Sequence, residues 1–247
     1  MNIKNLGPLL ATLVMAAGIG SASAATPLAG RDINRNAVAA NDANAVYLWD
    51  QDLGITWWRN ANINGQKDWA TQNNYVQTMV TGTGVNAISD WRLPSITDSG
   101  NDGCNFSYAG GTDCGYNVDT SGSEMAHLFY VTLGNKGYCP PGDVTCAGGP
   151  QTGWGLTNKG DFLNMQSYIY WSGTEYAPVT SGAWGFGTDD GLQVNYGKSS
   201  GFHAMAVRPG DVLAAQVPEP EMLVLVLTAL AVLGLGRRRR AVGASAL

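Results

Sequence analysis

The sequence predicts a mixed α+β fold in which short antiparallel strands and long loops outweigh two helices. Short runs of aromatic and β-branched residues flank turns that contain Asp and Gly, which is typical of β-hairpins. Two other segments carry apolar residues at helical spacing. The chain has 33 glycines and only 13% charged residues, a composition typical of an exported domain rich in loops. Eight Trp and ten Tyr can supply its core.

Two hairpins are the clearest strand predictions. The first pairs residues 45–49 with residues 55–59 around an Asp- and Gly-containing turn. The second covers residues 183–196 and turns at Asp189-Asp190-Gly191, because Asp and Gly favour tight turns. Further strands are predicted at residues 89–94, 167–172 and 202–208.

Two helices are predicted between these strands. The first spans residues 68–80 and ends before a pair of glycines. The second begins with Ser121 and Glu124, which match a capping box, and ends before Gly134. Residues 95–122 are expected to form a long polar loop that leads into this second helix.

The charges are distributed unevenly along the chain. Lys4 and the run 237–240 supply five of the fourteen basic residues, whereas residues 26–221 carry nine basic and nineteen acidic side chains. The body therefore has a net charge of about −10, and its basic residues are scattered. Such a surface repels polyanions, so the composition argues against a nucleic-acid partner and against sulfated polysaccharides.

The N-terminus has the three parts of a secretory signal peptide. Lys4 supplies the positive region, residues 6–19 form a short apolar run, and small residues follow up to Ala24 and Ala25. Cleavage is expected beside Ala24 or Ala25. We therefore interpret residues 1–25 as a signal peptide and residues 26–44 as a linker or a first irregular segment.

The C-terminus carries a short motif, an apolar run and a basic cluster, in that order. The motif is Val217, Pro218, Glu219 and Pro220, and its prolines keep the segment extended, as a protease requires. Residues 222–235 are apolar and marginal in length for a membrane span. The positive-inside rule predicts a cytoplasmic position for the cluster of Arg237, Arg238, Arg239 and Arg240.

Residues 217–240 closely resemble the PEP-CTERM sorting signal of Gram-negative, exopolysaccharide-producing bacteria. The resemblance implies export by the secretion machinery and recognition by an exosortase, a membrane cysteine-protease-like transpeptidase. It also implies transient inner-membrane anchoring, removal of the tail and delivery to the outer surface or the extracellular matrix. Residues 212–216 are then a short linker and residues 241–247 a cytoplasmic tail.

Four cysteines are expected to form disulfides, because an exported protein meets an oxidising compartment. Three pairings of these cysteines are possible. We favour Cys104–Cys114 and Cys139–Cys146, because each pair closes a short Gly-rich loop. The alternative is a zinc site, but the spacings fit zinc poorly and contain no C-x-x-C motif.

Six short motifs lie along the body of the chain. They are Leu53-Gly-Ile-Thr-Trp57, Asp90-Trp-Arg-Leu-Pro-Ser95, Ser123-Glu-Met-Ala-His-Leu-Phe129, Tyr170-Trp-Ser-Gly-Thr-Glu-Tyr176, Ala183-Trp184 and Ala206-Val-Arg-Pro209. In combination they resemble the Lcl C-terminal domain family, also called domain of unknown function 1566. We assign residues 45–211 to this domain. The resemblance implies a compact C-type-lectin-like fold with disulfide-stapled loops in a secreted or surface protein.

The family's best-known member binds sulfated polysaccharides through basic residues, but no matching basic cluster exists in this chain. The calcium motifs of lectins, Glu-Pro-Asn, Gln-Pro-Asp and Trp-Asn-Asp, are also absent from the sequence. Calcium-dependent sugar binding of the usual lectin kind is therefore not expected.

Several of the motif residues have a structural interpretation. Trp91 and Trp171 are expected to fill the core, as is Trp184, because Trp is costly to expose. Arg92, Glu175 and Arg208 are expected to form a partly buried ion-pair or hydrogen-bond network that fixes the ends of the last strands. The alternative is a polar ligand site made from the same groups.

The sequence predicts no enzyme. His127 and His203 are its two histidines, and neither stands in a recognisable nucleophile motif. Asp189 and Asp190 fit a turn better than a catalytic pair. No metal or cofactor is predicted; Ca²⁺ is the alternative, through the loop residues Asp98, Asp102 and Asp113, which do not match EF-hand spacing.

The leading functional hypothesis is a non-catalytic surface or matrix protein that binds exopolysaccharide or another matrix component. Trp154 is the first candidate contact, because glycines on both sides give it little local packing, and Tyr108 and Tyr116 follow. Aromatic rings among Asn, Ser and Gly suit neutral sugars. The alternatives are a structural matrix protein without a specific ligand and an enzyme that acts on matrix glycans.

Overall fold

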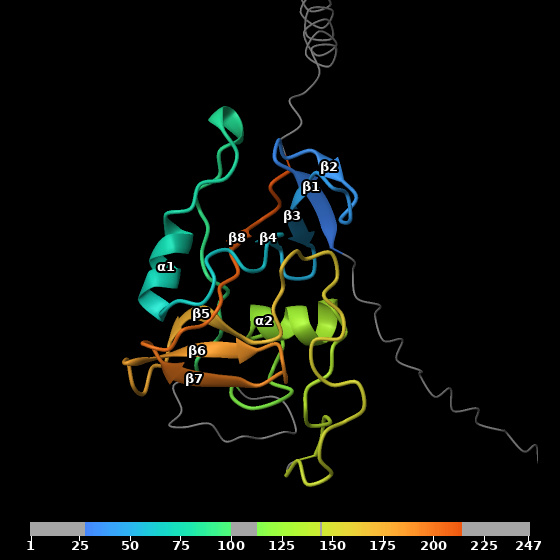
Figure 1. Cartoon of the computed structure of the whole chain (residues 1–247), viewed down its shortest axis with the longest axis vertical. Coiled ribbons are helices and arrows are strands. Elements are labelled where there is room, and N and C mark those ends of the chain that lie inside the picture. Colours follow the sequence, from blue (N-terminus) through green and yellow to red (C-terminus); the bar gives the residue numbers. More distant parts are fainter. Residues whose placement is uncertain (1–27, 100–112, 144, 214–247) are drawn as a thin grey trace, which may run out of the picture.

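The computed structural model describes residues 28–99, 113–143 and 145–213. Within them the chain forms two antiparallel sheets with short helices beside them, which confirms the predicted α+β class (Figure 1). The larger sheet has the order β2-β1-β3-β4-β8 and the smaller one β5-β6-β7. The strands are β1 Ala29–Asp32, β2 Ala37–Val38, β3 Ala45–Asp50, β4 Ile55–Trp58, β5 Ile169–Glu175, β6 Gly182–Gly187, β7 Gln193–Gly197 and β8 Val207–Pro209.

The hairpin predicted at residues 45–59 is confirmed as β3 and β4. Tyr47 lies opposite Trp58, and Asp50 lies opposite Ile55. The carboxylate of Asp50 accepts a hydrogen bond from the backbone N–H of Leu53 at 3.2 Å, which stabilises the turn. β8 pairs with the free edge of β4, so the last strand of the domain completes this sheet.

The larger sheet starts earlier than expected. β1 pairs with β3 on one side and with β2 on the other, so the interpretation of residues 26–44 as a linker is wrong for residues 29–38. β1 and β2 have only four and two residues, too few to show a period in the sequence. Gly30 is needed in β1, because a Cβ there would overlap the carbonyl oxygen of Ala39.

The hairpin predicted at residues 183–196 is also confirmed, as β6 and β7. Gly191 has a φ of +81° in its turn, which favours glycine. The carboxylate of Asp190 accepts a hydrogen bond from the N–H of Leu192 at 2.8 Å. The strand predicted at residues 167–172 is present as β5, which continues to Glu175.

The first helix, α1, spans Trp69–Gln77 and is shorter than predicted. Asp68 caps its N-terminus by accepting a hydrogen bond from the N–H of Thr71 at 3.0 Å. The chain leaves the helix because Thr81 pairs with Ile88 across a turn that contains the short helix η1, Gly84–Asn86. Val80, the last residue of the predicted helix, lies outside α1 and is 61% exposed.

The second helix begins two residues later than its sequence motif indicates. α2 spans Glu124–Ala126 and continues as the π-helical segment η2, His127–Thr132. Ser123 is the cap, and its hydroxyl accepts a hydrogen bond from the N–H of Ala126 at 3.1 Å. Ser121 instead donates to the carboxylate of Asp119, so the capping box predicted from Ser121 and Glu124 is wrong.

Two predicted strands are largely irregular in the structure. In the segment 89–94, Arg92 forms an isolated bridge to Val207. In the segment 202–208, β8 begins only at Val207, and the preceding residues make single bridges to Lys67 and Tyr170. Both segments run between the two sheets, where a continuous ladder partner is missing among the described residues.

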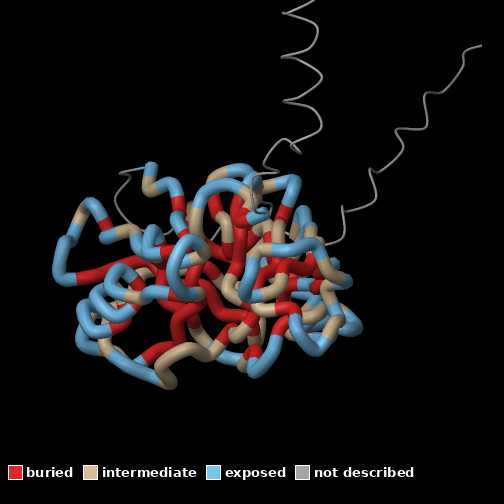
Figure 2. Tube along the Cα trace, turned by 90° about the horizontal axis from the view of Figure 1, so that it is seen from above, coloured by how far each residue is buried: buried red, intermediate tan, exposed pale blue. Residues whose placement is uncertain are grey.

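Both sheets and the α2–η2 segment contribute residues to the core. Figure 2 shows the buried residues gathered in the interior of the described chain. One cluster includes Trp57, Phe129 and Phe186, and a second includes Tyr47 together with Trp91 and Trp171. Trp184 is buried in a smaller, third cluster. The prediction that Trp91, Trp171 and Trp184 fill the core is therefore confirmed.

The disulfide predicted between Cys139 and Cys146 is present, with Cα atoms 5.3 Å apart. Cys114 is also disulfide-bonded, whereas Cys104 lies outside the described residues. The predicted signal peptide, the predicted sorting motif and the arginine cluster lie outside them as well. Within residues 28–213, as far as they are described, there is no helix long and apolar enough to cross a membrane.

Candidate glycan-binding site

Three aromatic side chains, the exposed Trp154 and the half-buried Tyr138 and Tyr116, form a row beside the Cys139–Cys146 loop. Trp154 is 41% exposed, and its ring meets that of Tyr138 edge to face, with centroids 5.0 Å apart. Tyr138 in turn lies 6.1 Å from Tyr116. The structure thus brings together two of the expected contacts, Trp154 and Tyr116; the third, Tyr108, lies outside the described residues.

Backbone contacts hold Trp154 and Tyr138 in place. The N–H of Gly155 donates to the carbonyl oxygen of Lys136 at 2.8 Å, so Trp154 lies beside the segment that carries Tyr138. Gly155 has a φ of +84°, and a Cβ on it would lie 2.7 Å from the carbonyl oxygen of Asp189. Glycine is therefore required next to Trp154, which leaves the indole ring little local cover.

Gln151 hydrogen-bonds to the backbone of the segment that carries Tyr138. Its side-chain amide donates to the carbonyl oxygens of Gly137 and Cys139 at 2.8 and 3.2 Å, and its N–H donates to that of Tyr138 at 3.0 Å. The Cys139–Cys146 disulfide closes the loop one residue after Tyr138. The aromatic row therefore rests on a braced loop, which lowers the entropy cost of binding a ligand.

A cleft of about 380 Å³ adjoins the row through Lys136, Gly137 and Gln151. Its walls are mainly amides, hydroxyls and small apolar groups, and Lys136 is exposed among them. The row itself does not line this cleft. The lining residues are Asn117, Val118, Thr120, Tyr130, Asn135, Lys136, Gly137, Pro141 and Gln151.

The turn between β6 and β7 hydrogen-bonds to two residues of the aromatic row. The N–H of Tyr138 donates to the backbone oxygen of Asp190 at 2.7 Å, and the hydroxyl of Tyr116 donates to the Asp190 carboxylate at 3.3 Å. Burial raises the pKa of Asp190, and the neighbouring charge of Asp189 adds to the rise. Among the described residues, one carboxylate oxygen of Asp189 is buried without a hydrogen-bond partner.

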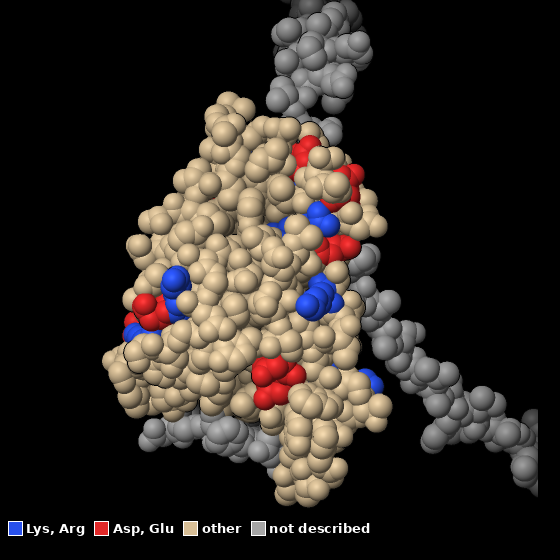
Figure 3. All heavy atoms as spheres, in the orientation of Figure 1, with Lys and Arg blue, Asp and Glu red and all other residues tan. Residues whose placement is uncertain are grey.

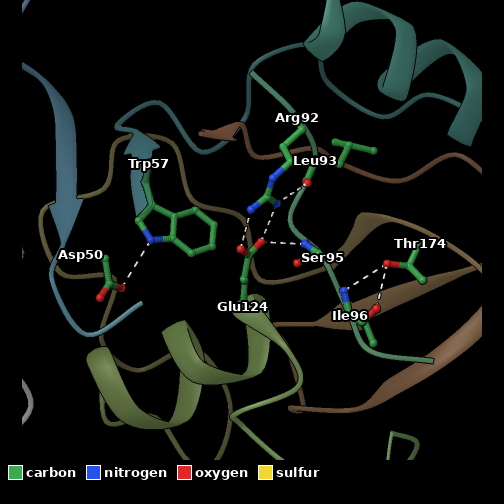
Figure 4. Close-up of polar contacts among 8 residues, drawn as sticks. All are labelled: Asp50, Trp57, Arg92, Leu93, Ser95, Ile96, Glu124 and Thr174. Atoms are coloured by element: carbon green, nitrogen blue, oxygen red, sulfur yellow. Dashed lines mark hydrogen bonds and ion pairs between the residues drawn. The ribbon is translucent and has the colours of Figure 1, made fainter. Parts of the chain in front are cut away.

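The polar network predicted from Arg92, Glu175 and Arg208 is wrong as a single unit. Arg92 forms a two-pronged ion pair with Glu124, with N–O distances of 2.6 and 2.7 Å (Figure 4). Arg208 pairs with Asp90, and Glu175 pairs with Lys198. Each group has a different partner because the network members come from separate segments, and the sequence does not show which segments meet.

Figure 4 also shows how the Arg92–Glu124 pair joins α2 to the segment that runs between the sheets. Glu124 accepts a second hydrogen bond from the N–H of Ser95 at 2.7 Å. The N–H of the next residue, Ile96, donates to the hydroxyl of Thr174 in β5, which donates back to the carbonyl oxygen of Ile96. The first turn of α2 is thereby fixed to the segment between the sheets, a structural role.

The histidines contact amides and hydroxyls. His203 is buried, and its Nδ1 lies 2.9 Å from the carboxamide oxygen of Asn62 while its Nε2 lies 3.4 Å from the amide nitrogen of Gln66. This pattern fits a neutral ring that donates from Nδ1, and burial lowers its pKa accordingly. His127 lies 3.3 Å from the hydroxyl of Thr132.

The aspartates considered for Ca²⁺ bind the protein itself. Asp98 accepts hydrogen bonds from the N–H of Ala177 and the indole of Trp184 at 2.6 and 2.8 Å. Asp113 accepts from the N–H and the hydroxyl of Ser99 at 2.8 and 2.5 Å. Asp102 lies outside the described residues, within which no group of three or more His, Cys, Asp or Glu is placed to hold a metal ion.

Sequence reasoning missed Tyr138, the central ring of the row. The available signal was its position next to Cys139 in a loop that also carries Trp154. Comparison with family models, with curated proteins and with solved structures finds no match to this chain. The function is therefore argued from the geometry of this site.

Proposed function

We propose that this chain is an exported, non-catalytic protein of the bacterial surface or extracellular matrix that binds a neutral exopolysaccharide. The observation that carries the proposal is the exposed ring of Trp154, packed edge to face on Tyr138 beside a cleft that has amide side chains among its lining residues. A partly exposed indole on a loop held by hydrogen bonds and a disulfide offers apolar area to a ligand at little entropy cost.

The chemistry of the row fits a sugar ring. The face of an indole packs against the C–H groups of a pyranose, while hydroxyl groups of the sugar hydrogen-bond to nearby amides and hydroxyls. Thr120 and Lys136 stand at the cleft beside the row. The acidic body disfavours a polyanionic ligand, so the ligand is a neutral or weakly charged glycan.

The sorting signal at residues 217–240 and the signal peptide at residues 1–25 support the proposed destination. On this proposal the chain is exported, anchored briefly in the inner membrane, cut by an exosortase and released to the outer surface or matrix. A C-type-lectin-like relation of the domain, with loops stapled by disulfides, belongs to the same proposal. It is supported by the mixed fold and by the Cys139–Cys146 disulfide, which lies beside the row.

Calorimetric titration with neutral oligosaccharides from the exopolysaccharide of the source bacterium tests the site. We expect Trp154→Ala and Tyr138→Ala to weaken binding by at least about tenfold, because truncating a central aromatic contact commonly costs about 2 kcal/mol. Tyr168→Ala is the matched control, since Tyr168 is similarly exposed but lies outside the row.

Equal weakening by the control and the row variants would argue against this site. Failure of the unaltered protein to bind any of these glycans would favour a structural matrix protein without a ligand. Release of shortened sugars would instead favour an enzyme that acts on matrix glycans.

A further inference from the structure

A second feature lies at the end of the molecule where the described chain stops. Four exposed apolar side chains gather there, and we call them the apolar end: Ile33, Tyr75, Val80 and Val85. A shallow groove of about 420 Å³ runs between three of them, with Ile63 and Met79 in its floor. Val85, at 91% exposure, is the most exposed large apolar residue among those described.

The apolar end includes a projecting turn that exposes an apolar side chain at its tip. Val85 belongs to η1, which projects from the body beyond α1 (Figure 1). The antiparallel bridge between Thr81 and Ile88, with N–O distances of 2.8 and 2.9 Å, holds the projecting turn. Because folding already orders this turn, contact between Val85 and a partner surface costs little further conformational entropy of the backbone.

The part of the apolar end formed by α1 and η1 is uncharged, whereas Ile33 directly follows Asp32. Residues 69–89, which include α1 and η1, contain no Lys, Arg, Asp or Glu. Figure 3 shows the surface over η1 free of charged atoms on the face in view. Charged groups are costly to bring against lipid, so their absence removes the main barrier to contact with a bilayer.

The chain leaves the domain next to this surface. Val212 is buried in the same cluster as Val76 and Ile88, and the partly buried members Trp58, Ile63 and Met79 of that cluster line the groove. Leu213 is the last described residue, and the apolar run begins at residue 222. The nine residue steps between them span at most about 30 Å.

We propose that the apolar end rests on the non-cytoplasmic face of the bilayer that holds the apolar run 222–235, with Val80 and Val85 inserted among the lipids. This proposal rests on the membrane-anchoring part of the proposed function. Because the tether keeps the domain near the bilayer, a few apolar side chains suffice for contact. Removal of the tail then also releases the domain from the membrane surface.

Hydrogen–deuterium exchange of the full chain tests this in vesicles of phosphatidylcholine. Flotation of the vesicles first shows whether the chain is anchored. We expect residues 82–87 to exchange more slowly in the anchored wild type than in anchored Val80→Asp or Val85→Asp variants. Val179→Asp, at a site that is 54% exposed in the β5–β6 turn, is the matched control and should keep the slow exchange.

Anchored chains whose residues 82–87 exchange alike in the wild type and both variants would overturn the docking while the anchor stands. A chain that does not float with the vesicles would overturn both the docking and the anchor, but not sugar binding, which the calorimetric titration measures separately. If residues 82–87 exchange slowly without vesicles, and more slowly as the protein concentration increases, a second copy of the chain covers the apolar end. Slow exchange without vesicles that is independent of concentration would show that the chain's own tail occupies the groove.

Discussion

At the scale of single residues, the candidate site depends on side chains whose surroundings are set by residues far away in the sequence. Tyr116 reaches the turn at Asp190, and Tyr138 reaches both Asp190 and Trp154. Asp190 is therefore a support for the aromatic row, and its carboxyl titrates in a partly buried environment beside Asp189. The free energy of unfolding therefore depends on pH through the titration of Asp190.

We predict that Asp190→Asn raises the melting temperature at pH 7. Burial raises the folded-state pKa of this carboxyl above its ordinary value of 3.8, so its ionisation opposes folding. The cost is absent below the unfolded pKa and grows as pH rises through the folded pKa. The advantage of the variant should therefore fade in melting curves recorded towards pH 3.

Asp143→Asn provides a control of opposite sign. A hydrogen bond from the N–H of Thr145 lowers the pKa of Asp143 in the folded state. The ionised carboxylate therefore stabilises the fold above the unfolded-state pKa, and this stabilisation is lost as pH falls through the folded-state pKa. A melting temperature of Asp190→Asn that stays below the wild type at every pH would contradict the assignment.

At the scale of elements, α2 shows how a short helix is held by tertiary contacts. It has three helical residues before the π-helical segment, too few to be stable alone. Ser123 caps it, and Glu124 ties its first turn to Arg92 and Ser95. The hydrogen bond with Glu124 raises the pKa of Arg92 above its ordinary value.

We predict that Glu124→Ala lowers the free energy of unfolding by about 1–2 kcal/mol, because Arg92 and the Ser95 N–H lose a charged acceptor. Glu175→Ala is the control, since its carboxylate side chain is 49% exposed against 14% for Glu124. Exposed pairs contribute about 0–1 kcal/mol. Urea unfolding of both variants measures the difference, and equal losses would contradict the structural role of the Glu124 pair.

At the scale of the whole molecule, the two ends of the domain are clasped together. Arg31 in β1 donates two hydrogen bonds to the carboxylate of Asp211, at 2.7 and 3.0 Å. The guanidinium is largely buried, and it also donates to the carbonyl oxygen of Gly30 at 2.8 Å. The clasp ties the first strand to the segment that follows the last one, directly before the predicted sorting tail.

We predict that Asp211→Ala lowers the free energy of unfolding by about 1–3 kcal/mol, because it leaves a buried cation without its acceptor. The double variant Arg31→Met with Asp211→Ala should recover part of the loss, since no buried charge remains unpaired. Thermal unfolding of both proteins measures this. A double variant with a lower free energy of unfolding than Asp211→Ala alone would contradict the explanation that the unpaired Arg31 charge causes the loss.

The sequence by itself determined the local features of this protein. Both hairpins, the start of α1 at Asp68 and the Cys139–Cys146 loop follow from turn residues, caps and short spacings. These features need only neighbours within a few residues, so the sequence carries them directly. The burial of Trp91, Trp171 and Trp184 follows in the same way from the size of the side chain.

Only the tertiary structure decided which distant segments meet. It placed residues 29–38 in the larger sheet, gave Arg92, Glu175 and Arg208 three different partners, and set Tyr138 between Trp154 and Tyr116. These contacts span many residues, and each charged or aromatic group had several acceptable partners in the sequence. The choice among them is made by the packing of the whole core, which no local pattern records.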